Sequence, residues 1–522
     1  MTSYLKHIAR RATPQSEPIP GTVPNSAGGH AFAVDDWARL DRFLILGAEG
    51  GSYYAGERQL TRENAEGLLR CVAADGARAV ARIAEVSEAG RAPRNEPALF
   101  ALAQAAASQD VATRRAALAA LPRVCRTGTH LFQFAAFAEG ARGWGRALRR
   151  AVGAWYLERP VEQLAYQLVK YRQRAGWSHR DLLRLSHPAT AEPARRALLD
   201  WACRGTEGEA LPVLARAAAA LGRATDAEAA ALIRAHDLPR EAVPTGLLGE
   251  AAVWGALLER MPLTALVRSL GKLTAAGVVR PLGENLPLVL SGLGDAGRIG
   301  RARLHPLAIL LALRTYAQGH GDRGKLRWEP VQPVIDALNA AFYTAFRAVE
   351  PTGRRILLAL DVSGSMGAGR VAGTALTPRE GSAAMALLTA ATEASTQIVG
   401  FTAGLTPLAL SPSMRLDDAV RAVSGLPFQA TDCALPMLYA LERGLSVDAF
   451  VIYTDSETWA GAVHPVQALR QYRERTGIAA KLVVVGMVSN GFSIADPGDG
   501  GMLDVVGFDS AAPAVIADFI RQ

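Results

Sequence analysis

The stretch LLALDVSGSMG, residues 357–367, decides how the last third of this 522-residue chain is built. Its first four residues continue the apolar run begun by Ile356, which is typical of a strand covered on both faces in a parallel α/β sheet. An acid and two hydroxyls follow at alternate positions, Asp361, Ser363 and Ser365. Open α/β sheets bind ligands at the carboxyl ends of their strands, and such oxygen ligands suit a hard cation such as Mg²⁺. For this motif alone, a serine-capped turn between strand and helix is the alternative interpretation.

The segments after Pro351 alternate between apolar strands and helix-like runs. The apolar runs are RILLALD, TQIVGFTA, DAFVIYTD, KLVVVGMV and MLDVVGF, and segments such as AAMALLTAATEAS and PVQALRQYRERTG separate them. This alternation predicts a doubly wound parallel sheet over residues 351–522. The boundary is expected near AVEPTGRR, residues 348–355, where Pro and Gly break the preceding helix.

Residues 1–350 are constructed differently. From about residue 60 they consist of Ala/Leu-rich helical segments with short breaks, for example ENAEGLLRCVAADGARAVARIAEV and EAAVWGALLERM. Proline often stands near the first turn of these segments, where its missing N–H costs nothing. We therefore expect an all-α array of HEAT-like repeats followed by an α/β domain, a fold of the class α plus α/β.

Charge is distributed unevenly between the two parts. Residues 1–346 carry 44 Lys and Arg against 32 Asp and Glu, a net charge of +12, whereas the remainder carries 13 against 17, a net charge of −4. A basic first part suggests a polyanionic partner, most commonly nucleic acid. Only five of the 57 basic residues are Lys, and codon bias is an alternative source of such an Arg excess.

The composition also indicates a compartment. No apolar stretch approaches the roughly 20 residues of a membrane helix, and the N-terminus lacks the apolar core of a secretory signal. The four cysteines, Cys71, Cys125, Cys203 and Cys433, are scattered without a CxxC pair. We expect a cytoplasmic protein without a membrane partner.

Two further segments supply ligands for the cation. Thr431 lies in a loop before a predicted helix, and Asp455 follows the apolar run DAFVIYT at the same sheet edge as Asp361. A DxSxS motif, a threonine loop and a strand-terminal Thr-Asp pair resemble the metal-ion-dependent adhesion site of von Willebrand factor A domains. The resemblance implies one divalent cation, most simply Mg²⁺, held by Asp361, Ser363, Ser365, Thr431 and Asp455, with one position open to an acidic group of a partner.

The segment EQLAYQLVKYRQRAGWSHRDLLRLSHP, residues 162–188, offers a candidate surface for phosphate. Four polar side chains share one narrow stripe if this segment is helical: Gln163, Gln167, Lys170 and Arg174. Ser178 and Asp181 resemble a capping box, which would place His179 and Arg180 at a helix N-terminus, where phosphate is favoured. A solvated helix face is the alternative interpretation of the stripe.

Longer stretches are similar to one known family, the Ro autoantigen or TROVE-domain proteins, and in particular to bacterial Ro orthologues of the Rsr type. They include RFLILGAEGGSYYAGERQLT, RNEPALFALA, RTGTHLFQF, GWGRALRRAVGAWY, KYRQRAGWSHRDLLRLSHP, AVWGALLERMPLTALVR, GHGDRGKLRWEP and EPTGRRILLALDVSGSM. The resemblance covers nearly the whole chain.

That resemblance implies a monomeric ring of helical repeats, the TROVE module of residues 1–350, closed by a von Willebrand factor A domain of residues 351–522. It implies binding of Y RNA on an outer basic surface and of defective or precursor RNA whose single-stranded 3′ end enters the ring hole. It also implies an exoribonuclease partner, such as polynucleotide phosphorylase, tethered through Y RNA. No catalytic activity is implied.

With the resemblance, three groups of residues become candidates for RNA contacts. The first is the stripe and the helix start that follows it: Lys170, Arg172, Arg174, His179, Arg180 and His187. The second is the shared helix face of Arg146, Arg149 and Arg150. The third is the turn-like segment that holds Arg126, Thr127 and His130.

Two rival functions remain open from the sequence. A metal-dependent protein-adhesion scaffold without an RNA role explains residues 351–522 but leaves the basic first part unexplained. Mg²⁺-dependent phosphoryl or nuclease chemistry at Asp361 and Asp455 is disfavoured, because a two-metal cleavage site needs a denser cluster of carboxylates.

Overall fold

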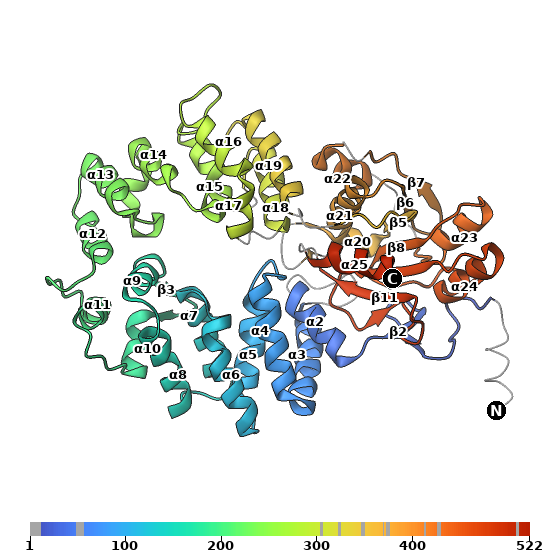
Figure 1. The fold of residues 1–522 in the computed structure, drawn as a ribbon, viewed down its shortest axis with the longest axis horizontal. Coiled ribbons are helices and arrows are strands. Elements are labelled where there is room, and N and C mark those ends of the chain that lie inside the picture. Colours follow the sequence, from blue (N-terminus) through green and yellow to red (C-terminus); the bar gives the residue numbers. More distant parts are fainter. Residues whose placement is uncertain are drawn as a thin grey trace.

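The computed structural model shows a curved array of helices whose two ends meet one sheet-containing domain (Figure 1). No helix in the described part of the chain is long and apolar enough to cross a membrane. The structure describes residues 12–47, 57–302, 306–321, 325–345, 350–368, 370–371, 376–411, 414–424, 430–507 and 511–522, so the stretches 42–61 and 348–355 lie partly outside it.

Successive helices with short connections form the array, as the sequence predicts. In chain order they are α2 (Asp36–Leu46), α3 (Glu57–Ala74), α4 (Gly76–Ala89), α5 (Glu96–Ala107), α6 (Val111–Val124), α7 (Gly128–Ala141), α8 (Arg146–Leu157), α9 (Val161–Lys170), α10 (His179–Ser186), α11 (Pro193–Arg204), α12 (Val213–Leu221), α13 (Asp226–His236), α14 (Ala251–Glu259), α15 (Leu263–Ala275), α16 (Leu286–Gly294), α17 (Ala296–Ala302), α18 (Pro306–Ala317) and α19 (Gln332–Thr344). Two 3₁₀ turns, η1 (Arg240–Ala242) and η2 (Thr245–Gly249), precede α14.

Local sequence signals explain where these helices begin. The side chains of Asp75, Asp110 and Thr127 each accept a hydrogen bond from a backbone N–H in the first turn of the helix that follows. The helices then pack through fully buried residues such as Leu99 and Phe132, which gives one continuous apolar core along the array.

The second part contains a six-stranded sheet in the order β11-β9-β8-β5-β6-β7. Its strands are β5 (Ile356–Asp361), β6 (Thr396–Phe401), β7 (Leu405–Pro407), β8 (Ala449–Thr454), β9 (Lys481–Gly486) and β11 (Met502–Val506). All neighbours are parallel except β6 and the short edge strand β7. The associated helices are α20 (Gly364–Ala368), α21 (Pro378–Thr392), α22 (Leu416–Ser424), α23 (Leu435–Glu442), α24 (Pro465–Thr476) and α25 (Ala511–Arg521), which confirms the predicted fold class.

The start of the chain packs on this sheet domain. Strands β1 (Thr22–Pro24) and β2 (His30–Ala33) form a hairpin, and β2 pairs with β10 (Phe492–Ser493). The buried Gln15 amide donates to Asp432 at 2.7 Å, and Asn25 donates to the carbonyl of Thr458. The structure therefore joins residues 13–33 to the domain that the sequence places after residue 350.

Both ends of the helical array contact the sheet domain. On α2, the buried Arg42 forms an ion pair with Asp504 at 2.7 Å. At the other end, Asp336 of α19 pairs with Arg415, and the Asn339 side chain accepts from the backbone N–H of Leu416. These contacts close the array into a ring (Figure 1).

Candidate functional site

The predicted metal ligands converge at one edge of the sheet. Strands β5 and β8 are parallel neighbours, so Asp361 at the end of β5 and Asp455 directly after β8 lie at the same edge. Ser363 and Ser365 follow in the loop and first turn of α20, with their Oγ atoms 3.0 Å apart. The backbone carbonyl of Thr431 accepts hydrogen bonds from the N–H groups of Trp459 and Ala460. The Thr431 loop therefore lies beside the segment that follows β8. Five oxygen-bearing side chains are thereby buried at one edge: Asp361, Ser363, Ser365, Thr431 and Asp455.

The electrostatics of this cluster favour a cation. Burial raises the pKa of Asp361, even though Ser363 and Thr454 donate hydrogen bonds to it. Burial and the charge of Asp361 together raise the pKa of Asp455 to about 8. Two buried carboxylates that repel each other are stabilised by a positive charge between them, and the hydroxyls around them are neutral oxygen donors. The residues therefore fit a Mg²⁺-class ion.

A buried arginine that the sequence interpretation missed stabilises the loop after Asp361 by donating hydrogen bonds to its backbone. The buried guanidinium of Arg379, on α21, donates to the backbone carbonyls of Val362 and Ser363. A capping box formed by Thr377 and Glu380 fixes the start of this helix. That capping box is visible in the sequence as TPRE, but the direction of the Arg379 side chain depends on how α21 packs against β5.

The stripe predicted over residues 162–175 is only partly helical. Helix α9 ends at Lys170, and Arg174 lies in a hairpin formed by β3 (Gln173–Arg174) and β4 (Trp177–Ser178). Arg174 therefore does not share a helix face with Lys170, which corrects the prediction. Arg172, Arg174, Arg180 and His187 are nevertheless exposed, and their contacts with RNA stay a prediction.

His179 packs in the core, although it also lines a cavity together with Arg172 and Arg180, and its contact with RNA stays a prediction. Its ring is 4 % exposed and packs against Phe132, Trp155 and Tyr156. The Tyr156 hydroxyl lies 2.9 Å from its Nδ1, and burial lowers the pKa of His179 to about 3. The predicted capping box of Ser178 and Asp181 is confirmed, but the first residue of the helix points inward.

The other predicted RNA residues fall into two kinds. Arg146, Arg149 and Arg150 are exposed on the first turns of α8, as their spacing predicts. The segment of Arg126, Thr127 and His130 spans the connection between α6 and α7 and the first turn of α7, and its side chains stabilise that connection. In this group, Thr127 Oγ1 accepts from the His130 N–H, the Arg126 guanidinium donates to Ser87 Oγ at 2.7 Å, and burial lowers the pKa of His130 to about 4.

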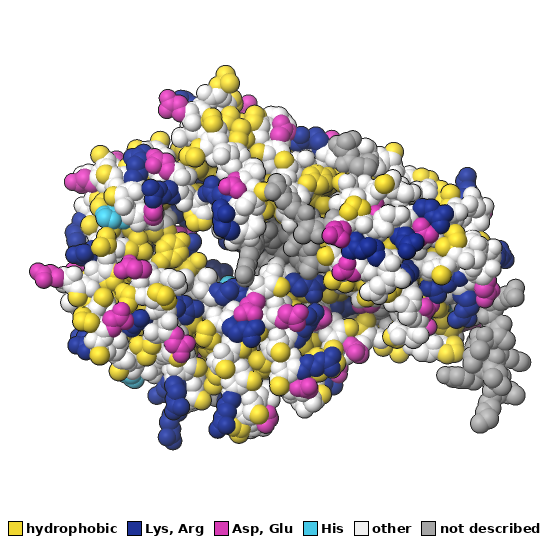
Figure 2. Space-filling model, viewed as in Figure 1, with side chains coloured by type: hydrophobic (Ala, Val, Ile, Leu, Met, Phe, Trp, Pro, Cys, Tyr) yellow, Lys and Arg dark blue, Asp and Glu magenta, His cyan; other side chains and the backbone are white. Residues whose placement is uncertain are grey.

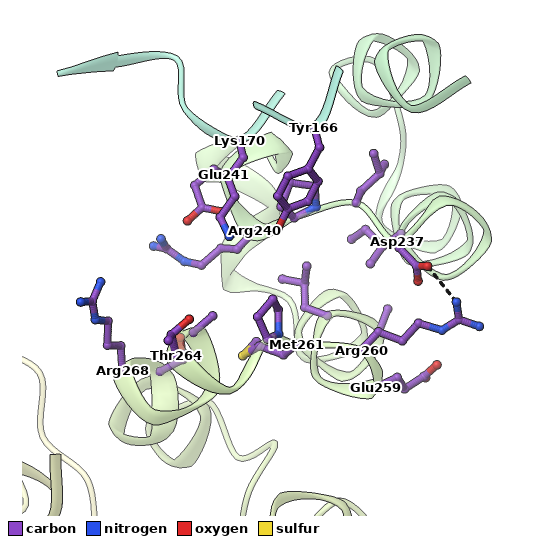
Figure 3. A pocket seen from close by; sticks show the side chains of 18 of the residues that line it. Tyr166, Lys170, Asp237, Arg240, Glu241, Glu259, Arg260, Met261, Thr264 and Arg268 are labelled. Carbon is purple, nitrogen blue, oxygen red and sulfur yellow. Dashed lines mark hydrogen bonds and ion pairs between the residues drawn. The ribbon is translucent and has the colours of Figure 1, made fainter. Parts of the chain in front are cut away.

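The structure adds a basic groove made of three adjacent cavities. The first, about 510 Å³, lies between α9, α13, η1, α14 and α15, and Lys170 and Tyr166 face Arg268 and Thr264 across it (Figure 3). It shares Glu241 with a cavity lined by Arg172 and Arg180. It also shares Arg268 and Thr264 with a third cavity beside α18. Figure 2 shows Lys and Arg side chains above and below the central hollow of this face.

The first cavity has an ion-paired half and a half with excess positive charge. Arg260 pairs with Asp237 at 2.8 Å (Figure 3). Arg234 pairs with Glu259 at 2.7 Å. On the opposite side, the described residues include no ion-pair partner for Lys170, Arg240 or Arg268, although the Lys170 ammonium donates to the Tyr166 hydroxyl at 3.0 Å. This half of the cavity is suited to an anion.

Positive charge accumulates further along the groove. Lys272, in the third cavity, has its pKa held below the usual range by burial and by the charge of Arg240. Sequence reasoning missed Arg240, Arg268 and Lys272, because they lie 70 to 102 positions after Lys170 and meet it only through the curvature of the array. Lys272 is one of only five lysines in the chain, and this scarcity is the signal that would have singled it out.

Comparisons with known proteins agree with this architecture. The chain matches a model of the TROVE domain over residues 23–208 and 236–315, and a model of the Ro60 vWA domain over residues 355–520. It is 44% identical to the RNA-binding protein RO60 of Deinococcus radiodurans, covering 100% of this chain and 99% of the relative. It is 35% identical to the RNA-binding protein RO60 of Caenorhabditis elegans, covering 99% and 92%.

A solved structure agrees as well. The crystal structure of the Deinococcus radiodurans RO (RSR) protein superposes with a TM-score of 0.71 at 44% identity, covering 93% of this chain and 99% of that one. The two curated relatives are named as RNA-binding proteins and not as enzymes. Full-length similarity, both domain matches and the shared fold show that the chain belongs to the TROVE-domain Ro60 family.

Proposed function

We propose that this protein is a non-catalytic RNA-binding protein that acts in the quality control and processing of noncoding RNA. Two relatives that match nearly the whole chain carry RNA binding in their names. The observation that carries the proposal is the groove in which Lys170, Arg240 and Arg268 outnumber Glu241, the carboxylate on their side, and form no ion pair among the described residues. Convergent cations bind phosphates without sequence preference, which suits a protein that captures many different RNAs.

Two RNA partners are proposed for two surfaces. A single-stranded 3′ end of a defective or precursor RNA follows the groove toward the ring hole. Y RNA binds exposed arginines elsewhere, with Arg146, Arg149 and Arg150 of α8 as the candidates. The proposal gives this chain no catalytic role. Degradation or trimming of the captured RNA would therefore be the task of an exoribonuclease that is tethered through Y RNA.

The metal cluster is proposed to hold one Mg²⁺-class ion through Asp361, Ser363, Ser365, Thr431 and Asp455. When bound, the ion supplies a Lewis-acidic position for a carboxylate of a partner. This favours a second candidate function, metal-dependent adhesion to an acidic partner protein, which is compatible with RNA binding elsewhere in the ring. Among the five residues of the cluster only Asp361 and Asp455 carry carboxylates, whereas a two-metal cleavage site needs a denser set, which disfavours the nuclease alternative.

The test uses an RNA duplex with a single-stranded 3′ tail in filter binding at several salt concentrations. Lys170→Ala combined with Arg268→Ala should weaken binding and lower the slope of log affinity against log salt by about 0.7 for each lost phosphate contact. Arg234→Ala combined with Arg260→Ala, on the ion-paired side of the same cavity, is the matched control and should change the slope less. Unaltered affinity and slope in the first variant would contradict the proposal.

A further inference from the structure

The segment of residues 13–33 packs against the two loops that carry Thr431 and Asp455. It precedes the helical array, and Gln15 lies 417 positions before its contact Asp432 in the Thr431 loop. The Gln15 backbone N–H donates to the carbonyl of Gly461, in the loop of residues 455–464 that follows β8, at 2.8 Å. The start of the chain thereby reaches both loops of the candidate metal site.

The Gln15 side-chain amide joins these two loops. Its Nε2 donates to Asp432 Oδ1 at 2.7 Å and to a backbone carbonyl of the loop after β8 at 2.8 Å. Its Oε1 accepts from the Thr458 hydroxyl and from the Gly461 N–H. The side chain is 0% exposed, and both of its N–H groups and both lone pairs of its oxygen have partners. Such a group fixes the distance between the loops that it joins.

A second contact of the segment leads to the Asp455 carboxylate. The backbone N–H groups of Ser26 and Ala27 donate to Oε2 of the buried Glu457 at 2.8 and 3.2 Å. The Glu457 N–H in turn donates to Asp455 Oδ1 at 3.1 Å. At Gly29 the fit is so close that an added Cβ would stand 2.0 Å from a backbone carbonyl of the same loop. A shift of the segment would therefore move the residue that orients a candidate metal ligand.

We propose that Gln15 is a positioning residue of the metal site, and that the segment of residues 13–33 completes this site by fixing the Thr431 loop relative to the Asp455 carboxylate. This assignment rests on the proposed Mg²⁺ site and adds to it a residue that is not a ligand. Groups that orient metal ligands typically change metal affinity by about 10–100-fold when they are lost. Because such coupling is reciprocal, bound Mg²⁺ in turn stabilises the packed segment.

Isothermal titration calorimetry of the full-length protein tests the role of Gln15. Gln15→Glu keeps the size of the side chain but turns a carboxylate oxygen toward Asp432, which should displace the Thr431 loop. Mg²⁺ affinity should fall about tenfold or more while circular dichroism shows a folded protein. Thr13→Val is the matched control, because it removes a contact of the same segment with Gln467 on α24, and it should keep the wild-type affinity.

Hydrogen exchange of the wild type gives a second measurement that needs no substitution and decides the matter if Gln15→Glu does not fold. Saturating Mg²⁺ should slow exchange of the backbone N–H groups in residues 13–33 about tenfold, and it should have no such effect in Asp361→Ala.

Two results would overturn the role of Gln15 while leaving the metal site intact. One is a Gln15→Glu protein that melts earlier in EDTA but binds Mg²⁺ with wild-type affinity, since Gln15 would then only stabilise the fold. The other is exchange in residues 13–33 that saturating Mg²⁺ does not alter. If the wild type binds no Mg²⁺, the proposed metal site fails, and the role of Gln15 fails with it.

Discussion

Among single residues, the carboxylates of Asp361 and Asp455 repel each other in the interior of the sheet domain. Both carboxyl groups are almost fully buried, and the charge of one opposes ionisation of the other. Hydrogen bonds from Thr454 and Ser363 to Asp361 reduce this conflict without removing it. A protein that retains such a pair stabilises it with a positive ion or with a bound proton.

We therefore expect Mg²⁺ to stabilise the folded protein. At a Mg²⁺ concentration of 100 times the dissociation constant, the gain in unfolding free energy should be about 2.7 kcal/mol. Asp361→Ala removes a ligand and should abolish both this gain and the heat of Mg²⁺ binding in isothermal titration calorimetry. RNA affinity should be unchanged in this variant, because the groove lies in the helical array. Mg²⁺ binding at wild-type affinity in Asp361→Ala would rule out the assigned ligands.

His179 leads to a prediction about acid stability. The pKa of the folded state, about 3, is lower than the ordinary value of 6.5, so the folded protein binds fewer protons than the unfolded chain between these values. The stabilising effect is present above pH 6.5 and is lost as the pH falls toward 3. Between pH 7 and pH 5 this single group should lower the unfolding free energy by about 2 kcal/mol.

Urea denaturation of the wild type and of His179→Phe at both pH values measures this effect. The phenylalanine variant lacks the titrating ring, so its stability should fall less between pH 7 and pH 5. His187→Phe, at an exposed position in the same region, is the control and should retain the wild-type pH dependence. Equal pH dependence in all three proteins would contradict the buried, neutral state of His179.

At the scale of elements, the sequence predicted the strands correctly, because the position of a strand depends mainly on residues that are neighbours along the chain. All five long strands appear where their apolar runs lie, because a strand buried on both faces needs such a run. The convergence of the candidate metal ligands was predictable too, since parallel neighbouring strands bring their carboxyl ends to one edge. The end of α9 was not predicted, because the hairpin after it depends on positive φ angles at Ala175 and Gly176.

Contacts between elements that are far apart in the sequence could not be predicted from the sequence alone. The groove joins α9 to α15 and then to the connection before α5, so its shape depends on the curvature of the whole array. The inward orientation of His179 likewise follows from the packing of α10 on α7 and α8, since the ring contacts Phe132 and Tyr156. Polar residues at a helix start are mostly exposed, and only this packing reverses that expectation.

At the scale of the whole molecule, the loops that carry Asp361 and Asp455, the candidate metal loops, lie between the two junctions that close the ring. On one side, the Asn490 side chain donates to the carbonyl of Asp455 at 2.6 Å and accepts from Arg42 of α2 at 2.8 Å. On the other side, Arg314 of α18 pairs with Glu380, the neighbour of the Arg379 that holds the Asp361 loop. A change in the position of either metal loop is thereby coupled to the attachment of a helix of the array.

This arrangement predicts that Arg42→Ala opens the ring at the α2 junction. The substitution removes a buried guanidinium from Asp504 and Asn490, and breaking a buried ion pair in this way costs about 3–5 kcal/mol. Small-angle X-ray scattering should show a larger radius of gyration, and Mg²⁺ should bind more weakly because Asn490 no longer fixes the Asp455 backbone. Arg82→Ala, which breaks a half-exposed pair with Asp41 inside the array, should change neither quantity. If the Arg42→Ala protein has the wild-type scattering curve, other contacts hold the junction. If its Mg²⁺ affinity is unchanged, metal binding is independent of ring closure.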